Sequence, residues 1–309
     1  MGKLLSDDDI QQYHRDGFFA PARVMSADDA LAFRRKFEAY EAAHEGWYEM
    51  SKGQKLYLLQ TWARDLAKHP KILDAVEDVM GPNLMVWGLS LFIKDAGSPN
   101  YVSWHQDSTY WGLSKPNVTT AWIALSPANR QSGCMKMMPG THQWEQIAHK
   151  DTLAQENLLT RGQEIAVNVN EDDAAYLELE PGEISLHNIR TVHASAPNVS
   201  TDRRIGIAVR YITPDVKQVN ADGDSAWLVR GEDTDGNAII DKDRVETGHP
   251  RPPGNRRTDG GLAGDADLGF NAAIKHRPDN AFVHVIVTDL KQAFGKTLRH
   301  PGRRPRAAG

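Results

Sequence analysis

Residues 193–210 read HASAPNVSTDRRIGIAVR, and the second half of this stretch alternates as a β-strand does. One face of the predicted strand carries Ile205, Ile207 and Val209. The opposite face carries Arg204, Gly206, Ala208 and Arg210. An arginine followed by two small residues leaves room for a ligand beside a permanent positive charge. The stretch therefore predicts a strand with a cationic pocket on one side.

Short segments rich in β-branched and aromatic residues make up this part of the chain. They are Leu84–Lys94, Val118–Ser126, Cys134–Met138, Glu178–His187 and Arg204–Thr213. Clusters of Gly, Pro, Asn and Ser separate them, and no regular helical pattern lies between them. Such a series predicts a mainly β fold, either an antiparallel sandwich or a jelly roll.

The first eighty residues have helical spacing instead. Ser6 and Asp9 form a capping pair, apolar residues recur from Leu31 to Ala43, and Gly81-Pro82 ends the last predicted helix. Helices that precede the strands are expected to flank the sheets on one face. We expect one domain over residues 1–309, with helices at about 6–80, a β core at about 84–214, long loops at about 216–280, and a closing strand and helix at about 282–298.

The composition is that of an ordinary globular protein, with 40% hydrophobic and 25% charged residues. This excludes disordered and fibrous classes. The net charge of −5 (36 − 41) provides no excess of cations for phosphate contacts, so nucleic acid is not an expected partner. We expect instead a small-molecule substrate and a monomer or homodimer.

The cellular location is predicted from cysteine and apolar content. The single cysteine, Cys134, excludes an intrachain disulfide and a cysteine-rich zinc site. The longest apolar-rich run, Leu84–Ile93, is about half as long as the ~20 residues of a membrane span, and the N-terminus lacks a secretory pattern. We therefore expect a cytoplasmic protein that does not bind a membrane.

Three His-x-Asp pairs are candidates for a metal site: His14/Asp16, His105/Asp107 and His149/Asp151. On a strand, such a pair places both side chains on one face, and one distant histidine then completes the triad that leaves open positions on Fe(II). The first pair falls in a predicted helix, where residues two apart point about 200° apart. The third falls in a predicted helical or loop connection. Only His105 and Asp107 lie in a strand-and-loop region with aromatic flanks, SWHQDSTYWGL.

The third ligand must come from a distant histidine near a predicted strand, and the candidates are His142, His187 and His193. A keto-acid cosubstrate needs a permanent cation for its far carboxylate, and arginine offers a bidentate fork. Arg204 follows His193 at the head of the alternating strand, whereas the other two histidines have no comparable arginine downstream. This favours His193.

Five motifs occur in order along the chain: WHQD at 104–107, AW at 121–122, SGCMKMMPGTH at 132–142, PGE at 181–183 and HASAPNVSTDRR at 193–204. With them the chain resembles the phytanoyl-CoA dioxygenase family of non-haem Fe(II), 2-oxoglutarate-dependent oxygenases. The resemblance covers roughly Ser6 to Pro214. It implies a double-stranded β-helix, or jelly-roll, core with flanking helices.

The resemblance also implies roles for individual residues. It implies that His105, Asp107 and His193 are the iron ligands and that Arg204 binds the C5 carboxylate of 2-oxoglutarate. Ser195 and Trp122 match family positions that line the cosubstrate pocket, and we add Thr120 to this set. Polar residues that we predict to face the pocket on the substrate side are Lys94, Tyr110, Asn117, Asn188 and Arg210.

The resemblance implies an oxygenase that uses Fe(II), 2-oxoglutarate and O2 to hydroxylate an unactivated C–H bond. Relatives that halogenate carry Ala or Gly where this chain has Asp107, which argues against halogenation. We expect a small polar or zwitterionic substrate such as an amino acid, a betaine-like molecule or an aminophosphonate. The alternatives are an acyl-CoA or carrier-bound acyl group and, in another class, a zinc hydrolase that uses the same His/Asp/His set.

Overall fold

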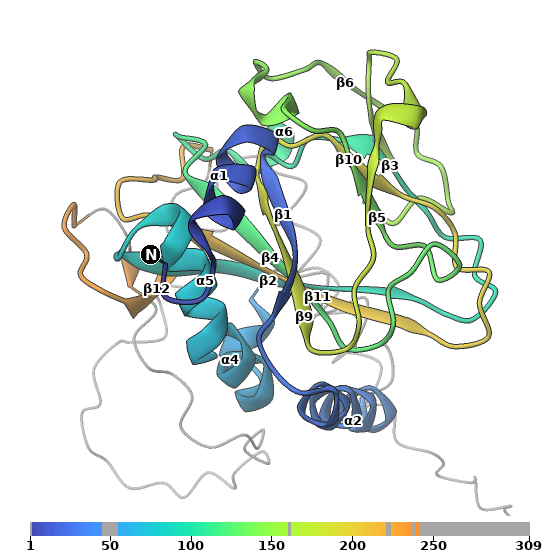
Figure 1. The fold of residues 1–309 in the computed structure, drawn as a ribbon, viewed down its shortest axis with the longest axis horizontal. Coiled ribbons are helices and arrows are strands. Elements are labelled where there is room, and N and C mark those ends of the chain that lie inside the picture. Colours follow the sequence, from blue (N-terminus) through green and yellow to red (C-terminus); the bar gives the residue numbers. More distant parts are fainter. Residues whose placement is uncertain (1, 45–54, 160–161, 221–223, 237–238, 241–309) are drawn as a thin grey trace, which may run out of the picture.

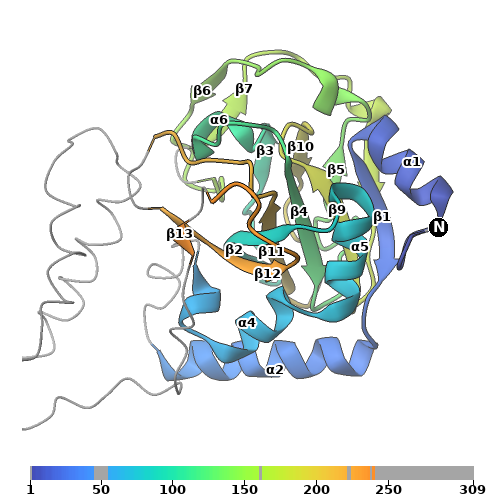
Figure 2. The ribbon, with the colours of Figure 1, turned by 90° about the vertical axis from the view of Figure 1, so that its left-hand side faces the viewer.

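The computed structural model describes residues 2–44, 55–159, 162–220, 224–236 and 239–240. Within these ranges, two β-sheets face each other and helices cover the outer face of the larger one (Figures 1 and 2). Pairing is antiparallel in both sheets except between the last two strands of the larger sheet. The predicted jelly-roll core with flanking helices is confirmed.

The larger sheet has the strand order β1-β9-β4-β11-β2-β12-β13. Its strands are β1 (Phe18–Arg23), β2 (Leu84–Lys94), β4 (Val118–Ala124), β9 (Glu183–Asn188), β11 (Arg204–Ile212), β12 (Ser225–Arg230) and β13 (Ile239–Ile240). The smaller sheet has the order β3-β10-β5-β8, with β3 (Val102–His105), β5 (Met135–Met137), β8 (Ala175–Leu177) and β10 (His193–Ser195). A third, two-stranded sheet pairs β6 (His149–Asp151) with β7 (Gln163–Ile165).

The helices lie mostly before the strands. They are α1 (Asp7–Asp16), α2 (Ala27–Ala43), α4 (Thr61–Ala67), α5 (Pro70–Met80) and the short α6 (Ser108–Trp111), with 3-10 turns η1 (Leu56–Leu58), η2 (Thr141–Gln143) and η3 (Glu171–Asp173). The Ser6 side chain accepts from the Asp9 N–H and the Asp9 side chain accepts from the Ser6 N–H, so the predicted capping box starts α1. No helix among the described residues is both long and apolar enough to cross a membrane.

Strand β11 lies at the centre of the larger sheet, between β4 and β2, and its two faces differ as the sequence predicts. Ile205, Ile207 and Val209 are fully buried in the main core, which the larger sheet forms with the helices. Their α2, α4 and α5 partners include Phe37, Trp62, Leu66, Ile72 and Val76. Arg204, Ala208 and Arg210 face the smaller sheet. The face with small residues therefore borders a pocket between the sheets.

Glycine is required at position 206 because the Trp122 ring lies directly against the β11 backbone. A Cβ atom at this position would come 1.8 Å from a Trp122 ring carbon, far inside van der Waals contact. Trp122 also packs with Ala124, Met135 and Leu177 in a second core between the two sheets. The small residues of β11 thus admit a tryptophan ring into the pocket wall.

Several strands lie where the sequence predicts none, and β1 and β12 are two of them. Strand β1 interrupts the predicted helical region, because Gly17 ends α1 in the left-handed conformation (φ 84°) and Phe18 and Phe19 then bury on opposite faces. Pro21 is tolerated because β1 is an edge strand. Strand β12 lies within the predicted 216–280 loops, where Trp227 stacks on Tyr57 at 6.0 Å between ring centroids. The predicted closing strand and helix at 282–298 lie outside the described residues.

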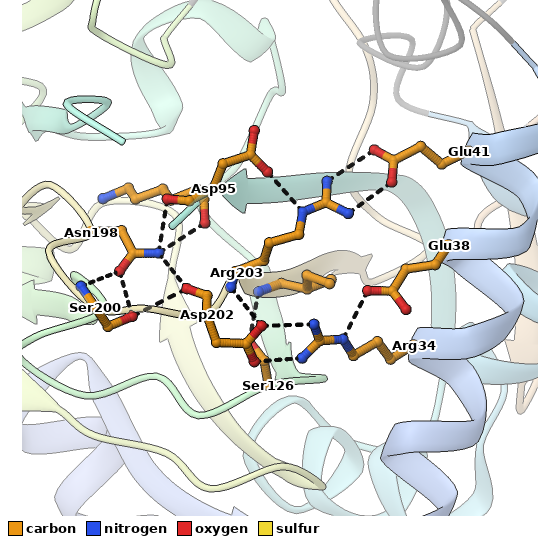
Figure 3. Close-up of polar contacts among 11 residues, drawn as sticks. Arg34, Glu38, Glu41, Asp95, Ser126, Asn198, Ser200, Asp202 and Arg203 are labelled. Carbon is orange, nitrogen blue, oxygen red and sulfur yellow. Dashed lines mark hydrogen bonds and ion pairs between the residues drawn. The ribbon is translucent and has the colours of Figure 1, made fainter. Parts of the chain in front are cut away.

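The loop between β10 and β11 is held by a polar network against α2 (Figure 3). Arg34 pairs with Asp202 at 2.7 and 2.9 Å, and Arg203 pairs with Glu41 at 2.8 and 2.9 Å. Inside the loop, Nδ2 of the fully buried Asn198 donates to three carbonyls, those of Lys94, Asp95 and Asp202, at 2.9–3.0 Å. The network fixes the strand that carries Arg204 relative to the strand that carries His193.

Removing the Asn198 amide is expected to destabilise the protein. Asn198→Ala removes the amide donor that the three carbonyls share and should lower the free energy of unfolding by about 2–4 kcal/mol. Asn198→Asp is nearly isosteric and should cost at least as much, because a carboxylate would face the carbonyl oxygens. Urea unfolding measures both changes. Ser200→Ala, which removes a hydroxyl at the edge of the same network, serves as the control; an equal loss in this variant would contradict the account.

Candidate metal and cosubstrate site

Three side chains that can bind a metal converge between the two sheets. His105 ends β3 and His193 begins β10, and these residues are directly paired in the smaller sheet. Asp107 follows β3 by two residues. One ligand atom from each of the three lies within 4.8 Å of the other two, and His105 Nε2 is 3.4 Å from Asp107 Oδ1. The predicted triad is therefore assembled in the structure.

The route by which Asp107 reaches this site differs from the prediction. Strand β3 ends at His105, and Asp107 has helical dihedral angles (φ −62°, ψ −33°) at the start of α6. The two side chains do not share a strand face, so the argument from strand periodicity is wrong. They converge because the chain turns into a short helix directly after the histidine.

Both histidine rings are oriented by backbone carbonyls. His105 Nδ1 lies 2.9 Å from the Ser103 carbonyl oxygen, and His193 Nδ1 lies 2.9 Å from that of Thr191. A carbonyl oxygen only accepts, so each Nδ1 carries the proton and donates it. Each Nε2 then keeps its lone pair, as in metal-binding histidines whose other ring nitrogen is hydrogen-bonded. The donor set fits Fe(II), which takes two imidazoles and one carboxylate.

The ionisation states of these groups also suit metal binding. Burial alone would raise the pKa of Asp107, but the contact with His105 and the nearby His193 and Arg210 lower it well below its usual value. Burial lowers the pKa of His193, and it lowers the pKa of the adjacent His187 to about 4. Near neutral pH Asp107 is therefore a carboxylate and His193 a neutral imidazole, the forms that bind metals.

The triad opens into a pocket lined from both sheets. Of the residues predicted from the sequence, the lining includes His105, Asp107, Thr120, Trp122, His193, Ser195, Arg204 and Arg210. Ala208 lines it too, as the alternation of β11 predicts, and so does His187, a candidate for the third ligand. Side chains in the lining that the sequence prediction did not include are Phe92, Val102, Met135 and Ala194. The pocket therefore brings the predicted metal and cosubstrate residues together.

Arg204 lies in the pocket wall beside a second basic side chain. It is 1% exposed, its Nη1 donates to the Gly133 carbonyl at 2.6 Å, and its Cζ lies 5.3 Å from the centroid of a Trp122 ring. Its cross-strand partner is Lys94, whose Nζ donates to Ser195 Oγ at 2.7 Å and to the Ala196 carbonyl. Burial, followed by the charge of Arg204, lowers the pKa of Lys94 to about 6. This end of the pocket suits an anion.

Of the remaining predicted residues, Lys94, Asn117 and Asn188 do not line the pocket. Lys94 lies behind Ser195. Asn117 is exposed and hydrogen-bonds to Asp215, and Asn188 donates to the Pro116 carbonyl. Asn188 follows His187 on β9, and because adjacent strand residues point to opposite faces, only the histidine reaches the pocket. Of Tyr110, the structure describes the backbone alone.

The third His-x-Asp pair supports the metal site from outside. His149 and Asp151 form strand β6, which corrects the prediction of a helical or loop connection. His149 Nε2 accepts from the Gln106 N–H at 3.0 Å, between the two predicted ligands. Gln106 is itself fully buried, and its Nε2 donates to the Arg190 carbonyl at 3.0 Å. His149 therefore helps to fix the turn that carries Asp107, a role that nothing in its spacing indicated.

The other candidate histidines have different positions. His14 and Asp16 lie in α1, as predicted, and do not belong to the triad. His142 lies in η2, where its Nε2 is 3.1 Å from the His14 carbonyl oxygen. His187 lines the pocket, with its ring centroid 5.0 Å from that of His193 and its Nε2 3.9 Å from Asp107 Oδ2. It is a neighbour of the triad on the larger sheet.

This fold and site define the class of non-haem Fe(II), 2-oxoglutarate-dependent oxygenases. A profile of the phytanoyl-CoA dioxygenase family matches residues 13–206, more than half of the chain, and the chain belongs to this family. Fe(II) and 2-oxoglutarate are therefore its cofactor and cosubstrate. The zinc hydrolase alternative is wrong, because the family and the similar proteins are oxygenases.

Individual comparisons agree with this assignment. The solved structure of the non-heme monooxygenase ThoJ is similar, with a TM-score of 0.66 and 33% identity over 75% of this chain and 87% of that one. CytC3, solved with Fe(II) and alpha-ketoglutarate, shares the fold with a TM-score of 0.56, 24% identity, and coverage of 78% and 94%. A probable alpha-ketoglutarate-dependent hypophosphite dioxygenase of Stutzerimonas stutzeri is 28% identical over 154 residues. That match spans 48% of this chain and about half (52%) of the relative.

Proposed function

We propose that this oxygenase hydroxylates an unactivated C–H bond of a small polar or zwitterionic molecule, with His105, Asp107 and His193 as its iron ligands. The observation that carries the proposal is the convergence of these three ligand atoms within 4.8 Å, in a pocket that also contains Arg204. In a 2-oxoglutarate enzyme, a buried arginine such as Arg204 can bind the distal carboxylate of the cosubstrate through two parallel hydrogen bonds.

Different residues of this chain have different roles in the proposed reaction. Bound Fe(II) and 2-oxoglutarate together activate O2 for C–H oxidation, with succinate and CO2 as coproducts. The Ser103 and Thr191 carbonyls hold the two imidazoles with Nε2 toward the metal. Arg204 binds the distal carboxylate, and Ser195, Trp122 and Thr120 line the same pocket. The buried pocket between the sheets keeps bulk water away from the reacting groups.

Asp107 supports hydroxylation over halogenation. Its carboxylate would bind the metal, with its negative charge, at the position that halogenating relatives leave for a halide. The two other candidate ligands are histidines, and Asp107 is the single carboxylate of the triad. The oxygen is then the group available to the substrate carbon.

The site and the similar proteins both favour a small substrate. The pocket lies between two sheets, and the name of the S. stutzeri relative refers to a small oxyanion, hypophosphite. The family name refers to an acyl-CoA, which remains the alternative substrate class. A long acyl-CoA needs a cationic surface for its phosphates, and the charge of the chain is negative overall.

The test is a substrate panel assayed by succinate release from the Fe(II)-loaded protein. Amino acids, betaines and aminophosphonates are compared with acyl-CoA thioesters, and products formed under 18O2 with excess chloride are analysed by mass spectrometry. We expect a small polar compound to stimulate succinate release and to gain one 18O atom. Stimulation by acyl-CoA alone would overturn the substrate class, and a chlorinated main product would overturn the predicted outcome.

A further inference from the structure

Three polar side chains form a row across the larger sheet, beside the triad. Arg210 on β11 is paired with Thr120 on β4, and Thr120 is paired with His187 on β9. Directly paired residues of an antiparallel sheet point to the same face. All three are at most 5% exposed and line the pocket that contains the triad. The row therefore forms one continuous polar wall of the active site.

Each member of the row keeps a buried polar atom that has no hydrogen-bond partner among the described residues. These atoms are Nε of Arg210, Oγ1 of Thr120 and Nδ1 of His187. Buried polar atoms in native proteins are almost always paired, and leaving them unpaired is unfavourable. Three such atoms on neighbouring strands, all facing the same pocket, indicate a polar ligand rather than three separate defects.

Arg210 gives the row a positive charge. Its Nη1 donates to Ser90 Oγ at 2.8 Å, its Cζ lies 4.6 Å from the centroid of a Trp111 ring, and it forms no ion pair within the part of the chain that the structure describes. The negative charge of Asp107 acts on Arg210 from nearby. In the proposed function, however, this carboxylate binds the metal and its charge is neutralised there. A buried guanidinium without a counterion of its own is costly, so an anionic ligand is expected.

The cosubstrate does not explain this second arginine. Arg204 and Arg210 are six residues apart on β11, which corresponds to about 20 Å of backbone at ~3.3 Å per residue. The five-carbon chain of 2-oxoglutarate has four C–C bonds of about 1.5 Å each. A cosubstrate with its distal carboxylate at Arg204 spans less than half of the separation between the two arginines, which leaves Arg210 for a second ligand.

We propose that the row of Arg210, Thr120 and His187 binds an oxyanion of the substrate, a carboxylate or a phosphonate, next to the metal. This rests on the function proposed above and specifies its substrate class. Arg210 supplies the charge and the directed N–H groups, Thr120 supplies a hydroxyl, and Trp111 holds the guanidinium plane. Because His187 Nε2 is 3.9 Å from Asp107 Oδ2, the row begins next to a predicted metal ligand. The C–H bond that reacts is accordingly within a few bonds of the oxyanion.

The experiment compares three small probes by calorimetry on the protein loaded with Fe(II) and 2-oxoglutarate, without O2. The probes are propionate, methylphosphonate and the neutral isostere propionamide. We expect at least one anion to bind wild-type protein about tenfold or more tightly than propionamide, the minimum expected of a charged partner in a buried site. The tighter of the two anions identifies the oxyanion. Equal binding of the anions and propionamide would overturn the proposal without any variant.

Variants of single residues then test which side chains bind the anion. Arg210→Met should remove the preference for the anion, Arg210→Lys should keep part of it, and Thr120→Val should weaken anion binding several-fold. The exposed Arg15→Met serves as the control and should bind like wild-type protein. In Arg210→Met, 2-oxoglutarate should bind within twofold of wild type; a tenfold loss would show that Arg210 serves the cosubstrate and would overturn the proposal. Failure of wild-type protein to bind Fe(II) and 2-oxoglutarate would instead overturn the proposed function.

Discussion

His193→Ala is expected to abolish Fe(II) binding and turnover. Removing an outer group that only orients a ligand already lowers metal affinity by about 10–100-fold, so loss of the ligand itself should exceed 100-fold. The same result is expected for His105→Ala, because these two directly paired histidines are the imidazole ligands in the proposed function. Metal content after equilibrium dialysis and succinate release together measure the effect.

The neighbouring His187 is the matched control for this prediction. Its ring centroid is 5.0 Å from that of His193, and it is equally buried, but it does not belong to the set of converging ligand atoms. His187→Ala should therefore retain Fe(II), whatever its effect on the substrate. Loss of metal in His187→Ala with retention in His193→Ala would show that the third ligand is His187 on β9 and not His193 on β10.

Arg204→Ala should weaken 2-oxoglutarate binding by a hundredfold or more. Removing one member of a buried charge pair costs about 3–5 kcal/mol, and a hundredfold change in the dissociation constant corresponds to about 2.7 kcal/mol. Arg204→Lys should restore only part of the affinity, because an ammonium group cannot replace the planar fork. Calorimetric titration of the Fe(II)-loaded protein with 2-oxoglutarate, without O2, gives these constants.

The adjacent Arg203 provides the control for charge. It points to the opposite side, toward Glu41 and Asp95, and it does not line the pocket (Figure 3). Arg203→Ala should leave the 2-oxoglutarate dissociation constant nearly unchanged while lowering stability. An equal loss of affinity in both variants, or none in Arg204→Ala, would reject the role of Arg204.

The parts of the fold that the sequence predicts well are those with strong patterns. The boundaries of β2 coincide with the predicted Leu84–Lys94, and β11 begins at the predicted Arg204 and ends one residue early at Ile212. Both strands lie in the middle of the larger sheet, where burial on both faces requires an unbroken apolar or small-residue run. Alternation on β11 also predicts which face borders the pocket.

The parts that the sequence does not predict depend on distant partners. Strand β1 contains a proline and follows a helix directly, and it exists because β9 offers it an edge. Asp107 reaches the metal site through a turn whose Gln106 is held by His149, 43 residues away. The sequence favours His193 over His187 because no comparable arginine follows His187, yet pairing of β9 with β4 brings His187 beside the triad. Such contacts are set by tertiary pairing and leave no local signal.

The most direct test of the central claim is a crystal structure of the protein with Fe(II) and 2-oxoglutarate, grown without O2. The account predicts the metal bound by Nε2 of His105, Nε2 of His193 and the carboxylate of Asp107. It also predicts a bidentate contact between the distal carboxylate of 2-oxoglutarate and Arg204. A metal held by His187 in place of His193, or a distal carboxylate bound at Arg210, would contradict it.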